Sequence, residues 1–222
     1  MVRPPRSATG NARSAPARPF LRGVDDARAL LLTAARDLFL ETGVSDFSLR
    51  EVARRVGISP AAVYRHFEHK EALITAACTQ GFQIFSSYLV RALSAPTPLG
   101  RLLAAGEQYR AFGLENPLDY RFIFMSPAEQ VCVPQDAQDV QAAQALPQYS
   151  TFRFLVDRVS ECMAAGVLEA DRAEPVAVFI WAHVHGLVSL RLATHLDWLG
   201  DDRAFAEHYR DSVARLLRGL SP

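Results

Sequence analysis

Apolar residues recur every three or four positions along most of the chain, which is the spacing of one face of an α-helix. No segment shows the strict alternation of apolar and polar residues that is typical of a β-strand. The first apolar stripe runs from Ala27 to Phe39; Asp25 or Asp26 can cap its start, and Gly43 can end it. The pattern therefore predicts an all-α fold.

Two short helices follow the first one, and a tight turn joins them. Ser48 can cap the first of these, with Glu51 completing a capping box, and Gly57 ends it. Ser59 can cap the second, whose first position is Pro60, where a missing N–H costs nothing. Three helices in close succession, the last two short and joined at a glycine, are typical of a helix-turn-helix domain.

Longer helical patterns occupy the rest of the chain. We expect helices over about residues 69–92, 97–115, 117–125, 152–166, 175–196 and 202–219, with a loop that can contain a short helical piece over 132–148. The segment from Val176 to Leu190 is apolar nearly all round, which predicts a helix buried on several sides. At this length it is too short to span a bilayer, so we expect no membrane contact.

The charges of the chain are divided unevenly between its two parts. The formal net charge is zero, which taken alone argues against a nucleic-acid-binding protein. Residues 1–70, however, hold 12 basic and 7 acidic groups, and residues 71–222 hold 12 basic and 17 acidic groups. A basic N-terminal module joined to an acidic helical body fits a DNA-binding domain with a separate sensing domain.

Residues 1–22 contain five arginines and no acidic residue, and they lack the apolar stretch of a signal peptide. This segment is either a disordered leader or a basic arm that lies along DNA phosphates. The three cysteines are odd in number and widely spaced, which excludes a disulfide framework and fits a reducing compartment. We therefore expect a cytoplasmic protein. Nothing in the residue spacing indicates a metal site, a cofactor or a catalytic triad.

The segment from Phe47 to Leu73, FSLREVARRVGISPAAVYRHFEHKEAL, resembles the DNA-binding domain of the tetracycline-repressor (TetR) family. The resemblance combines the glycine turn, Ser-Pro at the start of the third helix, Tyr-Arg-His-Phe, and Lys-Glu-Ala-Leu. It implies a DNA-binding domain over residues 23–70 and an effector-binding and dimerisation domain over residues 71–222. The last two helices would then pair with their copies as a four-helix bundle.

From this resemblance we expect a homodimeric repressor that binds a palindromic double-stranded DNA operator and is released by a small-molecule effector. Effector binding would tilt the fourth helix and change the spacing of the two recognition helices. Two alternatives stay open. One is an activator, or a regulator of the same fold that needs no ligand. The other is an all-helical enzyme or binding module with a vestigial helix-turn-helix.

The resemblance also assigns DNA contacts to particular residues. The third helix would enter the major groove with small residues at the base edges, and Arg50 could read a guanine. Arg65 could contact either a base or a phosphate, Tyr64 could also serve packing, and Arg54 and Arg55 fit a solvated face. The residues expected at the DNA are Ser48, Arg50, Ser59, Pro60, Ala61, Ala62, Tyr64, Arg65, His66 and Lys70. Of these, Ser48, Tyr64, His66 and Lys70 would grip phosphates.

Trp181-Ala-His-Val-His-Gly186 resembles the Trp-His-Gly (WHG) signature of one subgroup of the family, and residues 116–124 fit the same subgroup. Trp181 and His185 share a helix face and could line a ligand cavity, although His185 could equally be a core histidine. Gly186 would let another helix approach closely. The candidate cavity residues are Gln108, Tyr109, Phe112, Tyr120, Phe124, Cys162, Trp181 and His185. Composition favours a hydrophobic or amphipathic effector.

Overall fold

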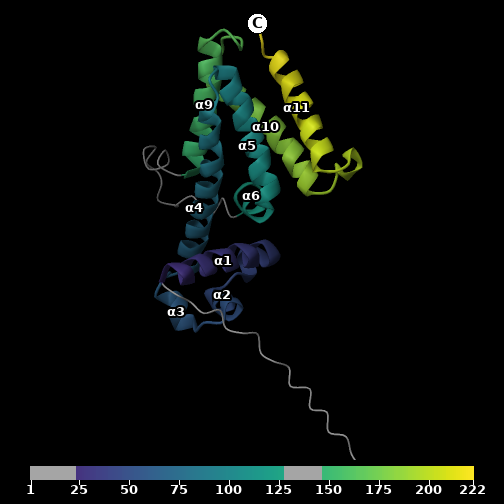
Figure 1. Ribbon diagram of the computed structural model, residues 1–222. Coiled ribbons are helices and arrows are strands. Elements are labelled where there is room, and N and C mark those ends of the chain that lie inside the picture. Colours follow the sequence, from purple (N-terminus) through teal and green to yellow (C-terminus); the bar gives the residue numbers. More distant parts are fainter. Residues whose placement is uncertain (1–23, 128–146) are drawn as a thin grey trace, which may run out of the picture.

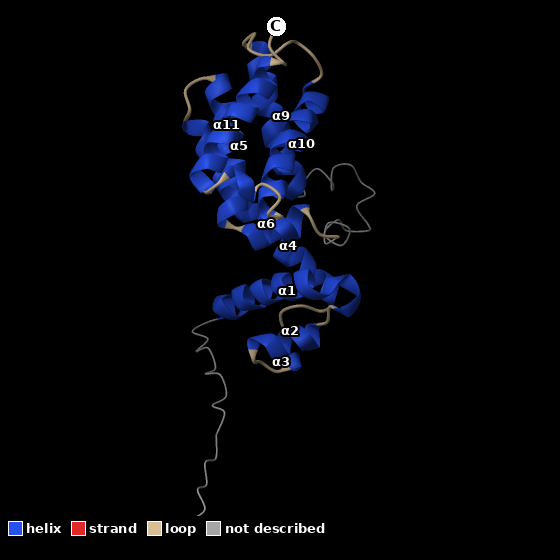
Figure 2. Cartoon of the chain, turned by 90° about the vertical axis from the view of Figure 1, so that its right-hand side faces the viewer, coloured by secondary structure: helices blue, strands red, loops and turns tan. Residues whose placement is uncertain are grey.

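The structure is a computed structural model that describes residues 24–127 and 147–222, and every regular element within these ranges is helical (Figures 1 and 2). The predicted all-α fold is confirmed. The helices are α1 (Val24–Asp46), α2 (Leu49–Val56), α3 (Pro60–Tyr64), α4 (Lys70–Leu89), α5 (Pro98–Glu115), α6 (Pro117–Phe124), α9 (Pro147–Ala164), α10 (Ala173–Leu192) and α11 (Asp202–Arg218), with 3₁₀ turns at Val90–Ser94 and Asp197–Leu199. The predicted arm (1–22) and the predicted loop, except its last two residues in α9, lie outside the described residues.

Helices α1, α2 and α3 form a small unit at one end of the molecule, and α4 runs from this unit into the larger helical body (Figure 1). The unit has its own apolar centre, in which Leu31, Phe39, Val52 and Val63 are each no more than 1% exposed. This centre explains why such short helices are stable, since packing of an apolar face supplies most helical stability in proteins. Phe67, between α3 and α4 in the sequence, is also buried and belongs to the apolar core.

Local hydrogen bonds fix the turn between α2 and α3. Gly57 has φ 78°, and its N–H and that of Ile58 both donate to the carbonyl of Ala53. The hydroxyl oxygens of Ser48 and Ser59 accept from the N–H groups of Glu51 and Ala62, each at 3.2 Å. The predicted caps and turn are therefore confirmed.

The predicted capping box is only half formed. The Glu51 carboxylate accepts from Arg54 Nε at 2.8 Å instead, and no hydrogen bond among the described residues joins it to the N–H of Ser48. Arg54 lies one turn further along the same helix face, where an arginine competes with the backbone N–H for the carboxylate.

Helix α10 differs most from its prediction. It begins two residues before Pro175, and it exposes Val178 (49%), Phe179 (54%) and Leu190 (44%) along one side. The expectation of a helix buried on several sides is therefore wrong for the single chain. At 20 residues it is long and apolar enough to cross a membrane by length and composition only, and the expected lack of membrane contact stays a prediction. Its other side packs against the protein through Ala177, Ile180, Val184 and Val188.

The cysteines also depart in part from the expected reduced state. Cys78 in α4 is disulfide-bonded, whereas Cys162 in α9 is a free and buried thiol. Burial raises the pKa of the Cys162 thiol, so this side chain stays protonated and packs as an apolar group.

Candidate DNA-binding surface and effector cavity

The N-terminus of α3 presents small side chains to solvent. Ser59, Pro60 and Ala61 are exposed and Ala62 is partly exposed, whereas Val63 is fully buried. Burial of Val63 and Phe67 fixes which face of this short helix points outward. A helix end with small side chains can approach DNA base edges closely, and alanine methyl groups can contact thymine methyl groups.

Three cations at this surface are not neutralised by acidic partners. Arg50 and Arg65 are exposed and form no ion pair with any described residue. Lys70 opens α4, and its Nζ donates to the carbonyl of Val44 at 3.4 Å. A lysine at a helix N-terminus adds its charge to a backbone end that already favours an anion.

The neighbouring arginines are paired instead. Arg54 binds Glu51, and Arg55 binds the Glu41 carboxylate in α1. Both arginines therefore form a paired, solvated face, in agreement with the prediction from the sequence.

The remaining predicted DNA contacts differ in exposure. Tyr64 is 51% exposed, which favours a role at the surface over a role in packing. Ser48 and His66 are partly buried, and the ring of His66 lies 6.5 Å from that of Phe67. All ten predicted residues thus come from α2 and its N-cap, from α3 and the residues next to it, and from the start of α4.

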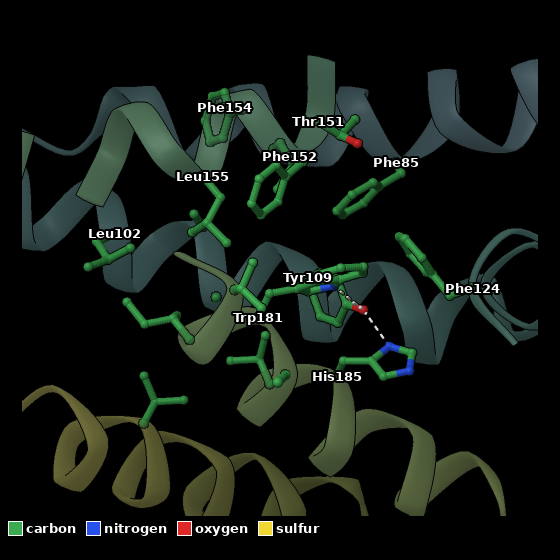
Figure 3. Close-up of a pocket in the computed structure, with 18 of the residues that line it drawn as sticks. Phe85, Leu102, Tyr109, Phe124, Thr151, Phe152, Phe154, Leu155, Trp181 and His185 are labelled. Carbon is green, nitrogen blue, oxygen red and sulfur yellow. Dashed lines mark hydrogen bonds between the residues drawn. The ribbon is translucent and has the colours of Figure 1, made fainter. Parts of the chain in front are cut away.

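A cavity of about 620 Å³ lies inside the helical body (Figure 3). Its wall comes from five helices, α4, α5, α9, α10 and α11, together with Phe124 at the end of α6. Most of this wall is apolar, as is usual for small-molecule sites. The aromatic side chains on it are Phe82, Phe85, Tyr109, Phe124, Tyr149, Phe152, Phe154 and Trp181.

The structure places four of the eight predicted cavity residues on this wall: Tyr109, Phe124, Trp181 and His185. The other four do not line it. Phe112, Tyr120 and Cys162 are fully buried in the core, and Gln108 is partly buried without lining the cavity. The wall residues of α4 and α9 were missed, because their apolar spacing looks the same as that of ordinary core helices.

A polar cluster forms one end of the cavity. Trp181 Nε1 donates to the Tyr109 hydroxyl at 3.3 Å, and that hydroxyl lies 3.2 Å from the Tyr120 hydroxyl. The two phenols lie 2.9 and 2.8 Å from His185 Nδ1, and the rings of Tyr120 and His185 stack. His185 is therefore hydrogen-bonded through its side chain to the two tyrosines, and it lies on the cavity wall as well.

The members of this cluster are held in their neutral forms. Burial lowers the pKa of His185, and burial raises the pKa values of Tyr109 and Tyr120. No acidic, lysine or arginine side chain is among the described residues that line the cavity. The site is thus apolar with an uncharged polar end. Among the described residues there is also no group of three or more potential metal ligands.

Helix α6 joins the cavity to the DNA-binding unit. Tyr120 and Phe124 belong to the aromatic cluster, whereas Asp119 and Phe122 contact α1. Arg36 Nη1 donates to both carboxylate oxygens of Asp119 at 2.8 Å, and the side chain of Asp119 is only 12% exposed. Phe122 meets Phe39 edge to face at 5.4 Å. A shift of α6 at the cavity would therefore act directly on α1 through these contacts.

Comparison with known families agrees with this arrangement. Residues 31–77 match the family described as bacterial regulatory proteins of the tetR family, and residues 102–213 match the tetracyclin repressor-like C-terminal domain. The chain belongs to the TetR family. It is a DNA-binding transcriptional regulator with a helix-turn-helix domain followed by a helical C-terminal domain.

Individual TetR-family relatives support the assignment along most of the chain. The chain is 32% identical over 180 residues to the HTH-type transcriptional activator FasR of Mycolicibacterium smegmatis, covering 81% of this chain and 75% of FasR. It is 28% identical over 94 residues to the class D tetracycline repressor protein of Escherichia coli, covering 42% of this chain and 38% of the repressor. A TetR-family transcription regulator from Marinobacter aquaeolei VT8 shares the fold, with a TM-score of 0.71, 20% identity and coverage of 88% and 96%.

Proposed function

We propose that this TetR-family regulator acts as a homodimer, binds a palindromic DNA operator through α3, and leaves the operator when a small molecule occupies the cavity. The observation that carries the proposal is that α6 contacts both the cavity cluster, through Tyr120, and the DNA-binding unit, through Asp119. Within this proposal, residue 70 separates a DNA-binding domain (23–70) from an effector-binding and dimerisation domain (71–222). Because its target is DNA, we place the protein in the cytoplasm.

The DNA-binding step uses the exposed face of α3 and the cations beside it. In a helix-turn-helix protein the N-terminal residues of the recognition helix meet base edges, and surrounding groups grip phosphates. The small side chains of Ser59 to Ala62 allow α3 to approach the bases closely. The guanidinium group of Arg50 fits guanine O6 and N7, and Lys70 contacts a phosphate. Ser48, Tyr64 and His66 add polar groups at the edges of this surface.

The homodimer is supported by the exposed side of α10. Val178, Phe179, Ala182 and Leu190 form an apolar stripe, and a side chain at Gly186 would meet no atom within 4 Å. Exposed apolar patches of this kind usually mark interaction surfaces, and a glycine on the stripe allows helices to approach closely. Pairing of α10 with its copy, beside α11, would cover the stripe and give each dimer two recognition helices. We also propose that the chain belongs to the WHG subgroup of the family.

Release of DNA would follow from a population shift. A ligand that binds more tightly when α6 is in one of two positions shifts the equilibrium toward that position. The size of the shift is set by the difference between the ligand's affinities for the two positions. Through the Arg36–Asp119 pair, α1 and with it α3 would move relative to α4. The distance between the two recognition helices of the dimer would then no longer match the operator.

The sign of regulation is a separate question. We propose a repressor, as the sequence predicts and as the name of the tetracycline repressor illustrates; the name of FasR, an activator, favours the alternative. Transcript levels in a strain that lacks the gene separate the two. The transcripts of target genes rise if the protein is a repressor and fall if it is an activator.

Retardation of the gene's own upstream DNA in a gel tests the proposal as a whole. A dimeric preparation is expected to retard the migration of this DNA at low salt and to release the DNA when the salt concentration is raised. Absence of retardation at low salt, together with turnover of a small molecule in the cavity, would favour the alternative of an enzyme or binding module with a vestigial helix-turn-helix.

A further inference from the structure

We propose that the cavity binds an uncharged, largely apolar molecule of about 20 non-hydrogen atoms, whose one hydroxyl or carbonyl oxygen lies against Tyr109 and Trp181. This inference rests on the proposed function of the cavity as the effector site, and it narrows the chemical class of the effector. Three properties of the wall lead to it: its lack of charge, its hydrogen bonds and its size.

No acidic, lysine or arginine side chain lies on the part of the cavity wall that the structure describes. Three arginines of α5 and α9 pair with acids instead: Arg101 and Arg158 bind Glu161, and Arg110 binds Glu107. His185 offers no positive charge either, because burial lowers its pKa. An ionised ligand would lose its hydration on entering this cavity and would gain no counterion, which disfavours carboxylates and ammonium groups alike.

The hydrogen bonds of the cluster leave one place for a ligand oxygen. The proton of Tyr109 goes to Tyr120 or to His185 Nδ1, and the indole N–H of Trp181 goes to Tyr109 (Figure 3). The bond from Trp181 is 3.3 Å long, at the weak end of the normal range, so this N–H can turn to a ligand carbonyl. A ligand hydroxyl can instead donate to the remaining lone pair of the Tyr109 oxygen.

The rest of the wall fits hydrocarbon. Away from the cluster it is built mainly from side chains such as Phe82, Phe85, Leu89, Leu102, Phe152 and Leu155, with the hydroxyl residues Tyr149 and Thr151 on α9. A cavity of about 620 Å³ holds about 20 water-sized volumes of roughly 30 Å³ each. That number gives the approximate size of the ligand in non-hydrogen atoms.

The chain contains a reporter for this site. It has two tryptophans, and Trp198 is 77% exposed whereas Trp181 lines the cavity. In a Trp198→Phe variant, all tryptophan fluorescence therefore comes from the cavity wall. We would titrate this variant at pH 7.5 with 1-dodecanol, dodecanoate and dodecyltrimethylammonium, which share a twelve-carbon chain, with each compound kept below its micelle concentration.

We expect 1-dodecanol to change the fluorescence of Trp181 saturably, with a Kd at least about tenfold lower than that of either ion. Binding of dodecanoate or dodecyltrimethylammonium as tight as that of the alcohol would overturn the proposal. Failure of the alcohol to bind at its solubility limit would overturn it too.

Two variants in the Trp198→Phe background test the physical reasons separately. Leu155→Lys places a cation in the wall and is expected to reverse the preference, so that dodecanoate binds more tightly than 1-dodecanol. Tyr109→Phe keeps the ring and removes the hydroxyl, and it should raise the Kd of 1-dodecanol by about fivefold, because the alcohol loses its hydrogen-bond acceptor. If Leu155→Lys does not fold, as judged by circular dichroism, Tyr109→Phe decides: an unchanged Kd of 1-dodecanol counts against the proposal.

Operator binding, measured beside the titrations, keeps this inference apart from the proposed function. If 1-dodecanol occupies the cavity and the protein stays on DNA, the ligand class stands and the effector role fails. If only a charged compound releases the DNA, the ligand class is wrong and the effector role stands.

Discussion

Among the residues that the structure describes, neither Arg50 nor Lys70 pairs with an acid, yet the two differ in what surrounds them. Arg50 is exposed on the first turn of α2, where its planar fork is free to meet a base edge. Lys70 is partly buried at the start of α4 and close to the carbonyl of Val44, so its charge is held in place. A free fork suits base reading, and a fixed point charge suits a phosphate.

Substitution of Arg50 by alanine should relax sequence preference at one position of each half-site. The expected loss of discrimination is about 1–3 kcal/mol at that position, because a bidentate contact with guanine is lost. Binding to operators that carry each base in turn measures it. Equal weakening on all four bases would instead make Arg50 a phosphate contact, and Arg54→Ala is the control because Arg54 is paired with Glu51.

Substitution of Lys70 by alanine should weaken binding to every DNA sequence alike. Each phosphate contact contributes about 0.9 to the slope of log K against log salt, so the loss of one contact per subunit should flatten the slope by about two in a dimer. The slope is read from anisotropy titrations at several salt concentrations. A slope equal to that of the unaltered protein contradicts the phosphate contact.

His185 should make stability depend on pH. Burial lowers its pKa in the folded protein, so below the ordinary histidine pKa of about 6.5 the unfolded chain binds more protons than the folded one. The free energy of unfolding should therefore be highest above that pH and fall as the pH drops toward 5. Chemical denaturation of His185→Gln across this range should show a smaller fall, with the exposed His208→Gln as control; an identical fall in both variants would contradict the assignment.

At the scale of elements, α6 is only eight residues long and serves two surfaces. Its neighbours are close: a Cβ at Gly81 of α4 would lie 2.7 Å from Ile123, so α4 and α6 pack with little space between them. Protein interiors are dense and transmit small displacements. In the proposed mechanism, the Arg36–Asp119 pair makes α6 the link through which cavity and DNA surface are coupled.

Substitution of Asp119 by asparagine should weaken that coupling while leaving a folded DNA-binding unit. We expect the drop in operator affinity caused by a ligand to shrink by a factor of about five or more, since typical couplings amount to about 1–3 kcal/mol. Operator affinity measured with and without ligand gives this ratio. Asp37→Asn is the matched control, because Asp37 also binds Arg36 but lies on α1 itself; a similar loss in both variants would contradict a special role for α6.

The elements that could be predicted are those whose form depends on residues close by in the sequence. The turn from α2 to α3 depends on Ser48, Gly57 and Ser59, whose hydrogen bonds reach only three or four residues along the chain. The cavity depends on five helices together, and spacing along one helix cannot distinguish Phe85, on the wall, from Phe112, in the core. Trp181 and His185 could be predicted together because they lie four residues apart, on one face of a single helix.

In the whole molecule, the DNA-binding surface around α3 and the apolar stripe of α10 lie in different parts of the chain. The DNA-binding unit lies at one end, and α10 and α11 lie in the body away from it (Figure 2). In the proposed homodimer, this separation would let one surface pair while the other binds DNA. The zero net charge of the chain is the sum of a basic part and an acidic part, each suited to its own task.

Substitution of Phe179 by aspartate should dissociate the homodimer. Phe179 is 54% exposed on the α10 stripe, and an aspartate there would bring a buried charge to the interface from each subunit. We expect the dimer dissociation constant to rise by at least about tenfold, measured by sedimentation. Val90→Asp is the control, since Val90 is 52% exposed but lies in the turn after α4; an unchanged dimer with Phe179→Asp would contradict the proposed interface.

Selection of bound fragments from the whole genome with the purified protein tests directly whether the protein binds an operator as a homodimer. A dimer with two recognition helices should enrich fragments that share an inverted repeat, with half-sites spaced by one or more turns of the DNA helix. Enrichment should also be lost with a protein whose Arg50 and Lys70 are both alanine. Fragments without a common inverted repeat, or enriched equally by that variant, would contradict an operator-binding homodimer.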